Sequence, residues 1–311
     1  MPKSRKVSPE DLPPSKWDKV RTATKVRSAL SQWWNPSYWT SVTEQRDLSM
    51  DMPLGDMACL ILKRFPYYTL IYVVVCIFMF FRDDTATQGN LAYVHDRATG
   101  TSSEWYTPMS ATFLHVNGAH LWLNMCMLGM GGGLLEFTEG HYFMLTLHLG
   151  AGPLAFGFHG FGSRMRVRGA SGVIYAIIFS QVALLKLNWR ELRCERWVRL
   201  LMLSALIAME VSLYITSPAH STSYLSHLFG ALIGICISLV CAKNVKVTWW
   251  EPIVIALAFG AYVSFCIFIF ITGQFACAIW GLGVTPKLLL NTYMYWRKAR
   301  LVRQGARAPL A

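Results

Sequence analysis

Seven apolar runs, each long enough to cross a lipid bilayer as a helix, dominate this chain of 311 residues. Hydrophobic residues make up 54% of the sequence and charged residues only 15%, whereas a soluble domain carries roughly 25% charged residues. Most connections between the runs are short, which leaves little room for a soluble domain. The sequence therefore predicts an all-α, multi-pass membrane protein with spans at 65–81, 113–135, 142–158, 169–187, 198–215, 224–241 and 252–272, the last of which can extend to 284.

The first six runs predict a six-helix core at residues 65–242, and the seventh an additional C-terminal transmembrane helix within 243–284. A polar, basic region at 1–64 precedes the core, and a basic tail at 285–311 follows it. Lys and Arg collect in the connection at 186–199, so the positive-inside rule places the N-terminus in the cytosol. Seven spans would then put the basic tail outside. A re-entrant or hairpinned last segment is the alternative.

The net charge of +12 is concentrated in the flanks of the chain. Because no basic-aromatic motif or nucleic-acid fold signature is present, we expect these flanks to meet anionic lipid headgroups, with no nucleic-acid partner. Most of the eight cysteines fall inside apolar runs and lack metal-ligand spacing. Neither a metal nor a cofactor is expected.

No cleavable signal peptide is visible, and Glu10 and Asp11 disfavour a mitochondrial presequence. We expect a protein of the secretory pathway or the plasma membrane, with mitochondria as the less favoured alternative.

Polar side chains are unusually dense in the second run, "FLHVNGAHLWLNMCMLGMGGGLLE", which holds His115, His120 and Asn124. His120 and Asn124 are four residues apart and share one helix face. Ionisable groups inside a membrane are costly and mark functional sites. Alternatively, such side chains hold membrane helices together by hydrogen bonds.

The fourth run opens with Gly169-Ala170-Ser171-Gly172, and Ser171 shares a face with Tyr175. Beside that face, small residues recur every fourth position, a pattern that lets helix backbones approach closely. Taken alone, Ser171 is best explained as part of this packing surface. The stripe consists of Gly172, Ala176 and Ser180.

The sixth run carries a matching stripe with a histidine at its head, made of His227, Gly230, Gly234 and Ser238. The two stripes are expected to pack together. The second, fourth and sixth runs all enter the bilayer from the outside, so their polar groups converge at one depth. A serine needs a base to take its proton, and His227 can be that base for Ser171.

An acyl-transfer site also needs donors for the oxyanion, and Asn124, His120 and the Ser171 backbone N–H are candidates. No acidic residue lies near His227 in the sequence, so a Ser–His dyad is expected, and the Tyr175 ring could orient the imidazole.

Three spaced elements, "HVNGAHLWLN" (115–124), "GASGVIYA" (169–176) and "SHLFGALIG" (226–234), resemble the rhomboid family of intramembrane serine proteases. The resemblance covers the six-helix core, and the extra C-terminal run is similar to the "6+1" arrangement of secretory-pathway members. The first loop departs from the family, with Trp105-Tyr106 where members usually carry Trp-Arg.

The resemblance implies roles for the candidate site residues. Ser171 is the nucleophile and His227 the general base, His120 and Asn124 bind the oxyanion, and Tyr175 stacks on His227. Gly169 and Gly172 shape the turn around the nucleophile, His115 supports the site, and Glu136 has a structural role.

The leading hypothesis is therefore a serine endopeptidase that cleaves single-span transmembrane proteins within or near the bilayer. Such substrates need a locally unwound helix, because an intact helix hides its carbonyls. One alternative is a catalytically inactive rhomboid-like binding or trafficking protein. Another is a transporter or channel, which explains the intramembrane histidines but not the joint spacing of the three elements.

Overall fold

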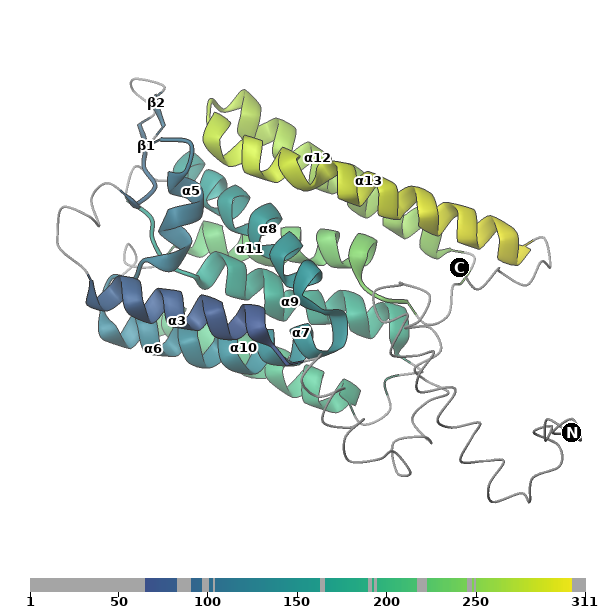
Figure 1. The fold of residues 1–311 in the computed structure, drawn as a ribbon, viewed down its shortest axis with the longest axis horizontal. Helices are drawn as coiled ribbons and strands as arrows, with labels where there is room; N and C mark the ends of the chain where they lie inside the picture. The colour runs from purple at the N-terminus through teal and green to yellow at the C-terminus, as the bar shows by residue number, and fades with distance from the viewer. Residues whose placement is uncertain are drawn as a thin grey trace, which may run out of the picture. The chain divides into compact units, whose positions relative to one another are not determined.

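The structure is a computed structural model that describes residues 65–82, 91–96, 101–102, 104–162, 166–189, 192, 195–216, 223–244, 248 and 250–303. These residues fall within one compact unit, Arg64–Ala308, and are almost wholly helical (Figure 1). The predicted N-terminal region, 1–64, lies outside them. The long helices are α3 (Tyr67–Phe81), α6 (Gly118–Met127), α7 (Gly133–Glu139), α8 (His141–Gly162), α9 (Ser171–Asn188), α10 (Glu195–Thr216), α11 (Tyr224–Cys241), α12 (Glu251–Ile271) and α13 (Phe275–Arg303).

The long polar connection after α3 contains short elements, in the order β1 (His95–Asp96), β2 (Thr101–Ser102), α5 (Thr107–Ser110) and η4 (Ala111–Phe113). β1 and β2 pair as an antiparallel two-residue ladder. An isolated antiparallel bridge joins Tyr93 to Val167, just before α9. The first loop is thus tied to the segment that leads into the fourth predicted span.

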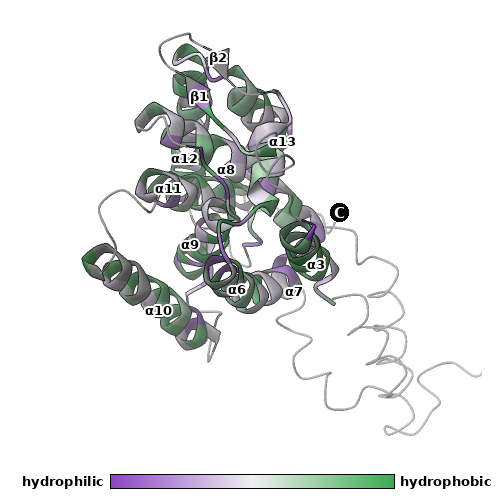
Figure 2. Cartoon of the chain, turned by 90° about the vertical axis from the view of Figure 1, so that its left-hand side faces the viewer, coloured by the Kyte–Doolittle hydropathy of each residue, from purple (hydrophilic) through white to green (hydrophobic). Residues whose placement is uncertain are grey.

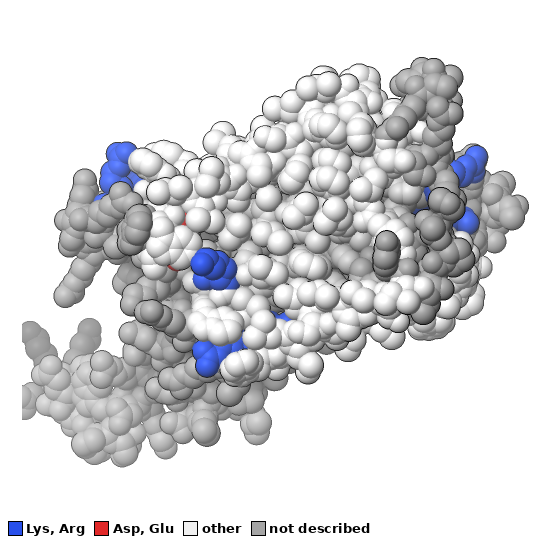
Figure 3. Space-filling model, turned by 180° about the vertical axis from the view of Figure 1, so that it is seen from behind, with Lys and Arg blue, Asp and Glu red and all other residues white. Residues whose placement is uncertain are grey.

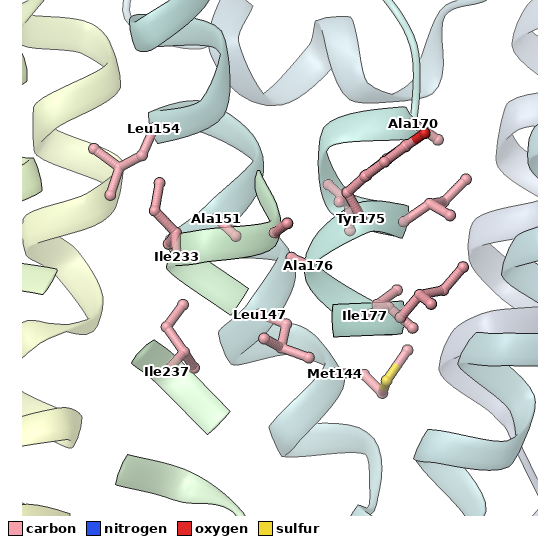
Figure 4. Packing of buried hydrophobic residues seen from close by; sticks show 14 of the residues in the cluster. Met144, Leu147, Ala151, Leu154, Ala170, Tyr175, Ala176, Ile177, Ile233 and Ile237 are labelled. Carbon is pink, nitrogen blue, oxygen red and sulfur yellow. The ribbon is translucent and has the colours of Figure 1, made fainter. Parts of the chain in front are cut away.

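The centre of the fold is formed by α8, α9 and α11, whose apolar side chains meet in one core (Figure 4). Leu147 and Ala151 of α8 are fully buried, as are Ala176 of α9 and both Ile233 and Ile237 of α11. α9 is apolar on nearly all sides because it is surrounded by other helices. The segment that begins at Ser171 is therefore held by packing around its whole circumference.

The closest helix approach is between α9 and α11, where backbone touches backbone. A Cβ added to Gly230 would lie 2.3 Å from the Gly172 carbonyl oxygen, and one added to Gly234 would lie 2.4 Å from Ala176 Cα. No side chain fits at either position. The prediction that the two small-residue stripes pack together is confirmed for these two pairs.

The second predicted span begins later and ends later than expected, running through α6, the π-helix η5 (Leu128–Gly132) and α7. Asn117 caps its start, since its side chain accepts a hydrogen bond from the His120 backbone N–H at 2.8 Å. Residues 113–117 are therefore loop or 3₁₀ turn. At the far end, buried Glu136 accepts hydrogen bonds from the backbone N–H groups of Tyr68 and Thr69, at 2.8 and 2.7 Å. Glu136 therefore holds the free N–H groups at the start of α3.

The C-terminal part differs from the predicted single additional helix, because two helices, α12 and α13, follow α11. The apolar run is broken at Gly273, which has a φ of +81° that only glycine adopts readily. α13 then continues to Arg303, through most of what was expected to be a basic tail. Trp280 and the buried Cys277 lie on its first turns.

The α12–α13 hairpin returns the chain to the end of the fold where α3 begins. Tyr295 of α13 donates a hydrogen bond to Glu251 at the start of α12. Asn244 donates to the same carboxylate at 2.7 Å, and the Lys243 backbone N–H donates to Glu139 at 2.9 Å. This hairpin is the alternative to a single last span that the positive-inside rule left open.

Among the described residues, three helices, α9, α11 and α12, are long and apolar enough to cross a membrane, and α3 is a shorter apolar helix. Figure 3 shows that Lys and Arg lie toward the two sides of the view, with a broad uncharged band between them. α10 stands at the margin of the described helices (Figure 2) and exposes large apolar residues such as Leu201 and Ile215. This distribution is that of a membrane protein.

Candidate active site at the N-terminal ends of α6, α9 and α11

The segment that precedes Ser171 is held by the first loop. The Val167 backbone exchanges two hydrogen bonds with Tyr93, at 2.9 and 3.2 Å, and the Gly169 N–H donates to the Ala111 carbonyl at 2.9 Å. Gly169 has a φ of +140°, a conformation that side chains disfavour. The chain therefore turns sharply at Gly169, and Ser171 becomes the first residue of α9, partly exposed at the helix end.

His120 lies directly beside this turn. A Cβ added to Gly169 would lie 2.9 Å from His120 Cε1 and 3.8 Å from Ser171 Oγ. Gly169 thus leaves the space that the imidazole of His120 occupies next to the serine. Glycine is therefore required at position 169 for two reasons, which are the positive φ and the close approach of the His120 ring.

His115 lies behind His120, away from the surface. The two imidazole rings meet edge to face, with centroids 5.3 Å apart and planes at 63°. His115 is buried, whereas His120 is partly exposed. His115 therefore packs against the ring that adjoins Gly169, and its contact is with His120 rather than with Ser171.

Asn124 lies one turn further along α6 and is only 6% exposed. Its side-chain nitrogen, Nδ2, has no hydrogen-bond partner among the residues that the structure describes. An unpaired buried amide donor costs free energy unless a ligand or water satisfies it. Asn124 is thus a donor available to a group bound at this end of the helices.

His227 lies on the first turn of α11, and Tyr175 lies on the second turn of α9. Their rings are stacked, with centroids 4.2 Å apart and planes at 10°. Gly172 lies one turn before Tyr175 and Gly230 one turn after His227, so their backbone contact holds the two helices together beside the stacked rings. The imidazole of His227 is 8% exposed and is held flat against the phenol ring.

His120 lies within electrostatic range of both His227 and Arg168. The structure therefore brings Ser171, His120, His227 and Tyr175 to one end of the fold. Glu136 lies at the opposite end of the second span, where it caps α3. The side chain of Glu210 lies outside the described part of the chain.

Sequence reasoning missed two residues that hold the nucleophile segment, Tyr93 and Ala111. Both act mainly through backbone hydrogen bonds, to Val167 and Gly169. Backbone pairing between distant loops leaves no periodic pattern in a sequence, so no motif pointed to them. The long connection at 82–112 was itself the only available signal, because long loops in compact proteins are often functional.

The sequence is similar to known proteins over the segment that carries this site. Residues 102–244, which include the last part of the first loop and all the candidate site residues, match the Rhomboid domain family. Rhomboid-related protein 1 of Caenorhabditis elegans is 31% identical over 122 residues, which cover 36% of this chain and 34% of the relative. Rhomboid-related protein 3 of Homo sapiens is 25% identical over 189 residues, covering 56% of this chain and 46% of the relative.

A bacterial relative also matches. Rhomboid protease GlpG of Haemophilus influenzae is 24% identical over 112 residues, which cover 35% of this chain and 58% of that protein. The matches thus span from about a third to somewhat over half of the relatives' lengths. All three relatives are named as rhomboid proteins, and the matched Rhomboid domain contains the segments of Ser171 and His227. Residues 102–244 therefore form a domain of the rhomboid family.

Proposed function

We propose that this protein is an intramembrane serine endopeptidase in which Ser171 and His227 form the catalytic dyad. The observation that carries the proposal is the stacking of His227 on Tyr175, with ring centroids 4.2 Å apart, beside the Gly172–Gly230 backbone contact. A base of a nucleophilic serine needs a fixed orientation. The stacked tyrosine supplies it in place of the carboxylate of a classical triad.

In this mechanism His227 takes the proton from Ser171 Oγ as the oxygen attacks the scissile carbonyl. The imidazolium then gives that proton to the leaving amine, which separates from the acyl-enzyme. Water, activated by the same imidazole, attacks the ester and releases the second fragment. Ser171 regains its proton, so the cycle consumes only water and one peptide bond.

The oxyanion of the tetrahedral intermediate is assigned to three donors. Asn124 supplies the unpartnered Nδ2 described above, and His120 supplies its ring N–H. The Ser171 backbone N–H is the third, because it is the first of the free N–H groups at the N-terminus of α9. The positive end of the α9 dipole favours negative charge at the same place.

Substrates in this proposal are single-span transmembrane proteins that approach through the bilayer. The side next to α10 is the favoured route, since α10 buries few of its described residues and exposes Leu201, Ile207 and Val211. Buried Arg199 holds the start of α10 in place through hydrogen bonds to Gln181 and Thr138. Small or helix-breaking residues are expected near the cleavage point, where the substrate helix must unwind.

The proposed setting is a six-helix core with its N-terminus in the cytosol, in a secretory-pathway membrane or the plasma membrane. The active site then faces the outside. The connection at 216–223 is proposed to cap the site, and its residues 217–222 lie outside the described residues.

The test uses purified protein reconstituted in liposomes with a single-span fluorescent reporter. Wild type is expected to cut the reporter and to react with a serine-directed fluorophosphonate, and Ser171→Ala is expected to do neither. Ser180→Ala is the matched control, because Ser180 lies on the same helix and its hydroxyl donates to the Ile177 carbonyl of that helix. Equal cutting by Ser171→Ala and wild type would show that the dyad assignment is wrong. If wild type neither cuts nor labels, the inactive rhomboid-like binding protein becomes the better assignment.

A further inference from the structure

The turn between α12 and α13 lies at the same end of the fold as Ser171, and it contacts the first loop there. The Tyr93 hydroxyl donates a hydrogen bond to Gln274 Oε1 at 3.0 Å. Both side chains are buried, with 1% and 0% of their surface exposed. Burial raises the pKa of the Tyr93 phenol well above its usual range, so Tyr93 remains a hydrogen-bond donor.

This hydrogen bond is built into the packing of α8. A Cβ added to Gly160 would lie 2.6 Å from Gln274 Oε1, so only glycine admits the amide at this point. The Tyr93 ring lies parallel to the Phe156 ring, with centroids 6.5 Å apart. A second contact follows on α13, where the Trp280 indole N–H donates to the Trp105 carbonyl at 2.9 Å and the two indoles stack.

Tyr93 is in turn the residue that pairs with the segment before the nucleophile. Its backbone exchanges two hydrogen bonds with Val167, which lies four residues before Ser171. A continuous path therefore runs from Gln274 through the Tyr93 side chain and backbone to Val167 and then to the Gly169 turn. The amide of Gln274 fixes the position of Tyr93, and Tyr93 fixes one edge of the nucleophile segment.

We propose that the α12–α13 hairpin is a positioning element of the active site, and that Tyr93 and Gln274 are its positioning residues. This inference rests on the proposed function, since it assigns a role in placing Ser171 for attack. Neither residue touches the reacting atoms. The first loop and the additional C-terminal helices thus act together on the geometry of Ser171.

The experiment compares Tyr93→Phe, Gln274→Leu and the double variant in the liposome assay. Because a displacement of about 1 Å can cost ~100-fold in rate, a partial relaxation is expected to lower kcat about tenfold with KM unchanged. The hydrogen bond between Tyr93 and Gln274 is absent in all three variants, so the double variant should lose no more kcat than either single variant. Gln274→Leu also removes a hydrogen bond to Thr272, which lies within the hairpin. Amide hydrogen exchange is expected to become faster at Val167 and Gly169.

Tyr262→Phe is the matched control. Tyr262 is also a buried tyrosine of the hairpin, but its hydroxyl donates to the Gly281 carbonyl within the hairpin at 2.8 Å and to the Gly150 carbonyl of α8 at 3.4 Å, and neither acceptor lies in the first loop. It is expected to lower the melting temperature without changing kcat or the exchange of Val167. Wild-type kcat and exchange in Tyr93→Phe and Gln274→Leu would overturn the inference. An equal fall of kcat in Tyr262→Phe, at the same loss of melting temperature, would overturn it as well.

The two proposals fail differently. A wild-type protein without Ser171-dependent cleavage or labelling contradicts the proposed function and with it the catalytic role of the hydrogen bond. Normal wild-type cleavage with unaffected Tyr93 and Gln274 variants contradicts only the role of the hairpin.

Discussion

The alanine substitution of Gly230 tests whether the contact between α9 and α11 sets the geometry of the candidate dyad. The new Cβ would lie 2.3 Å from the Gly172 carbonyl oxygen and 3.1 Å from its carbonyl carbon. Ordinary contact begins at 3.4 Å. The neighbour is backbone in the middle of a packed helix turn and cannot rotate away, so the two helices must separate by about 1 Å at this level.

His227 lies three residues before Gly230 and moves with it. The separation shifts the imidazole away from the Tyr175 ring and from the start of α9, where Ser171 lies. We expect kcat to fall by about 100-fold, and overpacking to lower the free energy of unfolding by about 1–3 kcal/mol. The rate loss is then far larger than partial unfolding of a stable protein can explain.

The assay measures reporter cleavage per folded molecule, with folding followed by thermal denaturation. Gly260→Ala in α12 is the matched control, since no atom lies within 4 Å of its added Cβ. That change should leave kcat unaltered and stabilise the helix by about 0.5–1 kcal/mol. If Gly230→Ala folds and retains kcat within about twofold of wild type, the backbone contact does not position the dyad and the reasoning is refuted.

Three further predictions address the oxyanion, the end of α3 and the membrane topology. Asn124→Ala is expected to lower kcat by about 100-fold with KM unchanged, because an oxyanion donor acts in the transition state; a raised KM with normal kcat would instead indicate a role in substrate binding. Glu136→Ala removes the acceptor of the Tyr68 and Thr69 N–H groups, so the free energy of unfolding should fall by about 2 kcal/mol, while kcat per folded molecule stays at the wild-type value. Cysteines placed at Phe65 and Arg300 should react with an impermeant maleimide from the same side of a sealed vesicle, since α12 and α13 form a hairpin; reaction from opposite sides would favour a single additional span.

Much of the core could be predicted from the sequence because apolar runs and small-residue stripes follow helix periodicity. The stripe through Gly230 and Gly234 predicted the contact with α9, and the structure places it at Gly172 and Ala176. What could not be predicted was the break at Gly273. A glycine inside an apolar run is equally compatible with a continuous helix, and only its φ of +81° distinguishes the turn.

The same limit applies to the candidate site. Ser171, His120 and His227 could be brought together by combining helix periodicity with membrane depth. The backbone hydrogen bonds from Tyr93 and Ala111 could not, because backbone groups are identical at every position of a sequence. The start of the second span was also misplaced, since the capping role of Asn117 was outweighed by the apolar residues before it.

The packing and catalytic explanations of the Gly-Ala-Ser-Gly segment are not true alternatives. Gly172 has no side chain that would keep α11 away, so His227 can lie against Tyr175 near the start of both helices. Gly169 does the same for His120 on the other side of Ser171. The serine therefore lies between two close approaches, each of which brings an imidazole near it. A serine used only for packing would need the first approach alone; the second, with its positive φ at Gly169, has a physical reason only when a histidine must reach the start of α9.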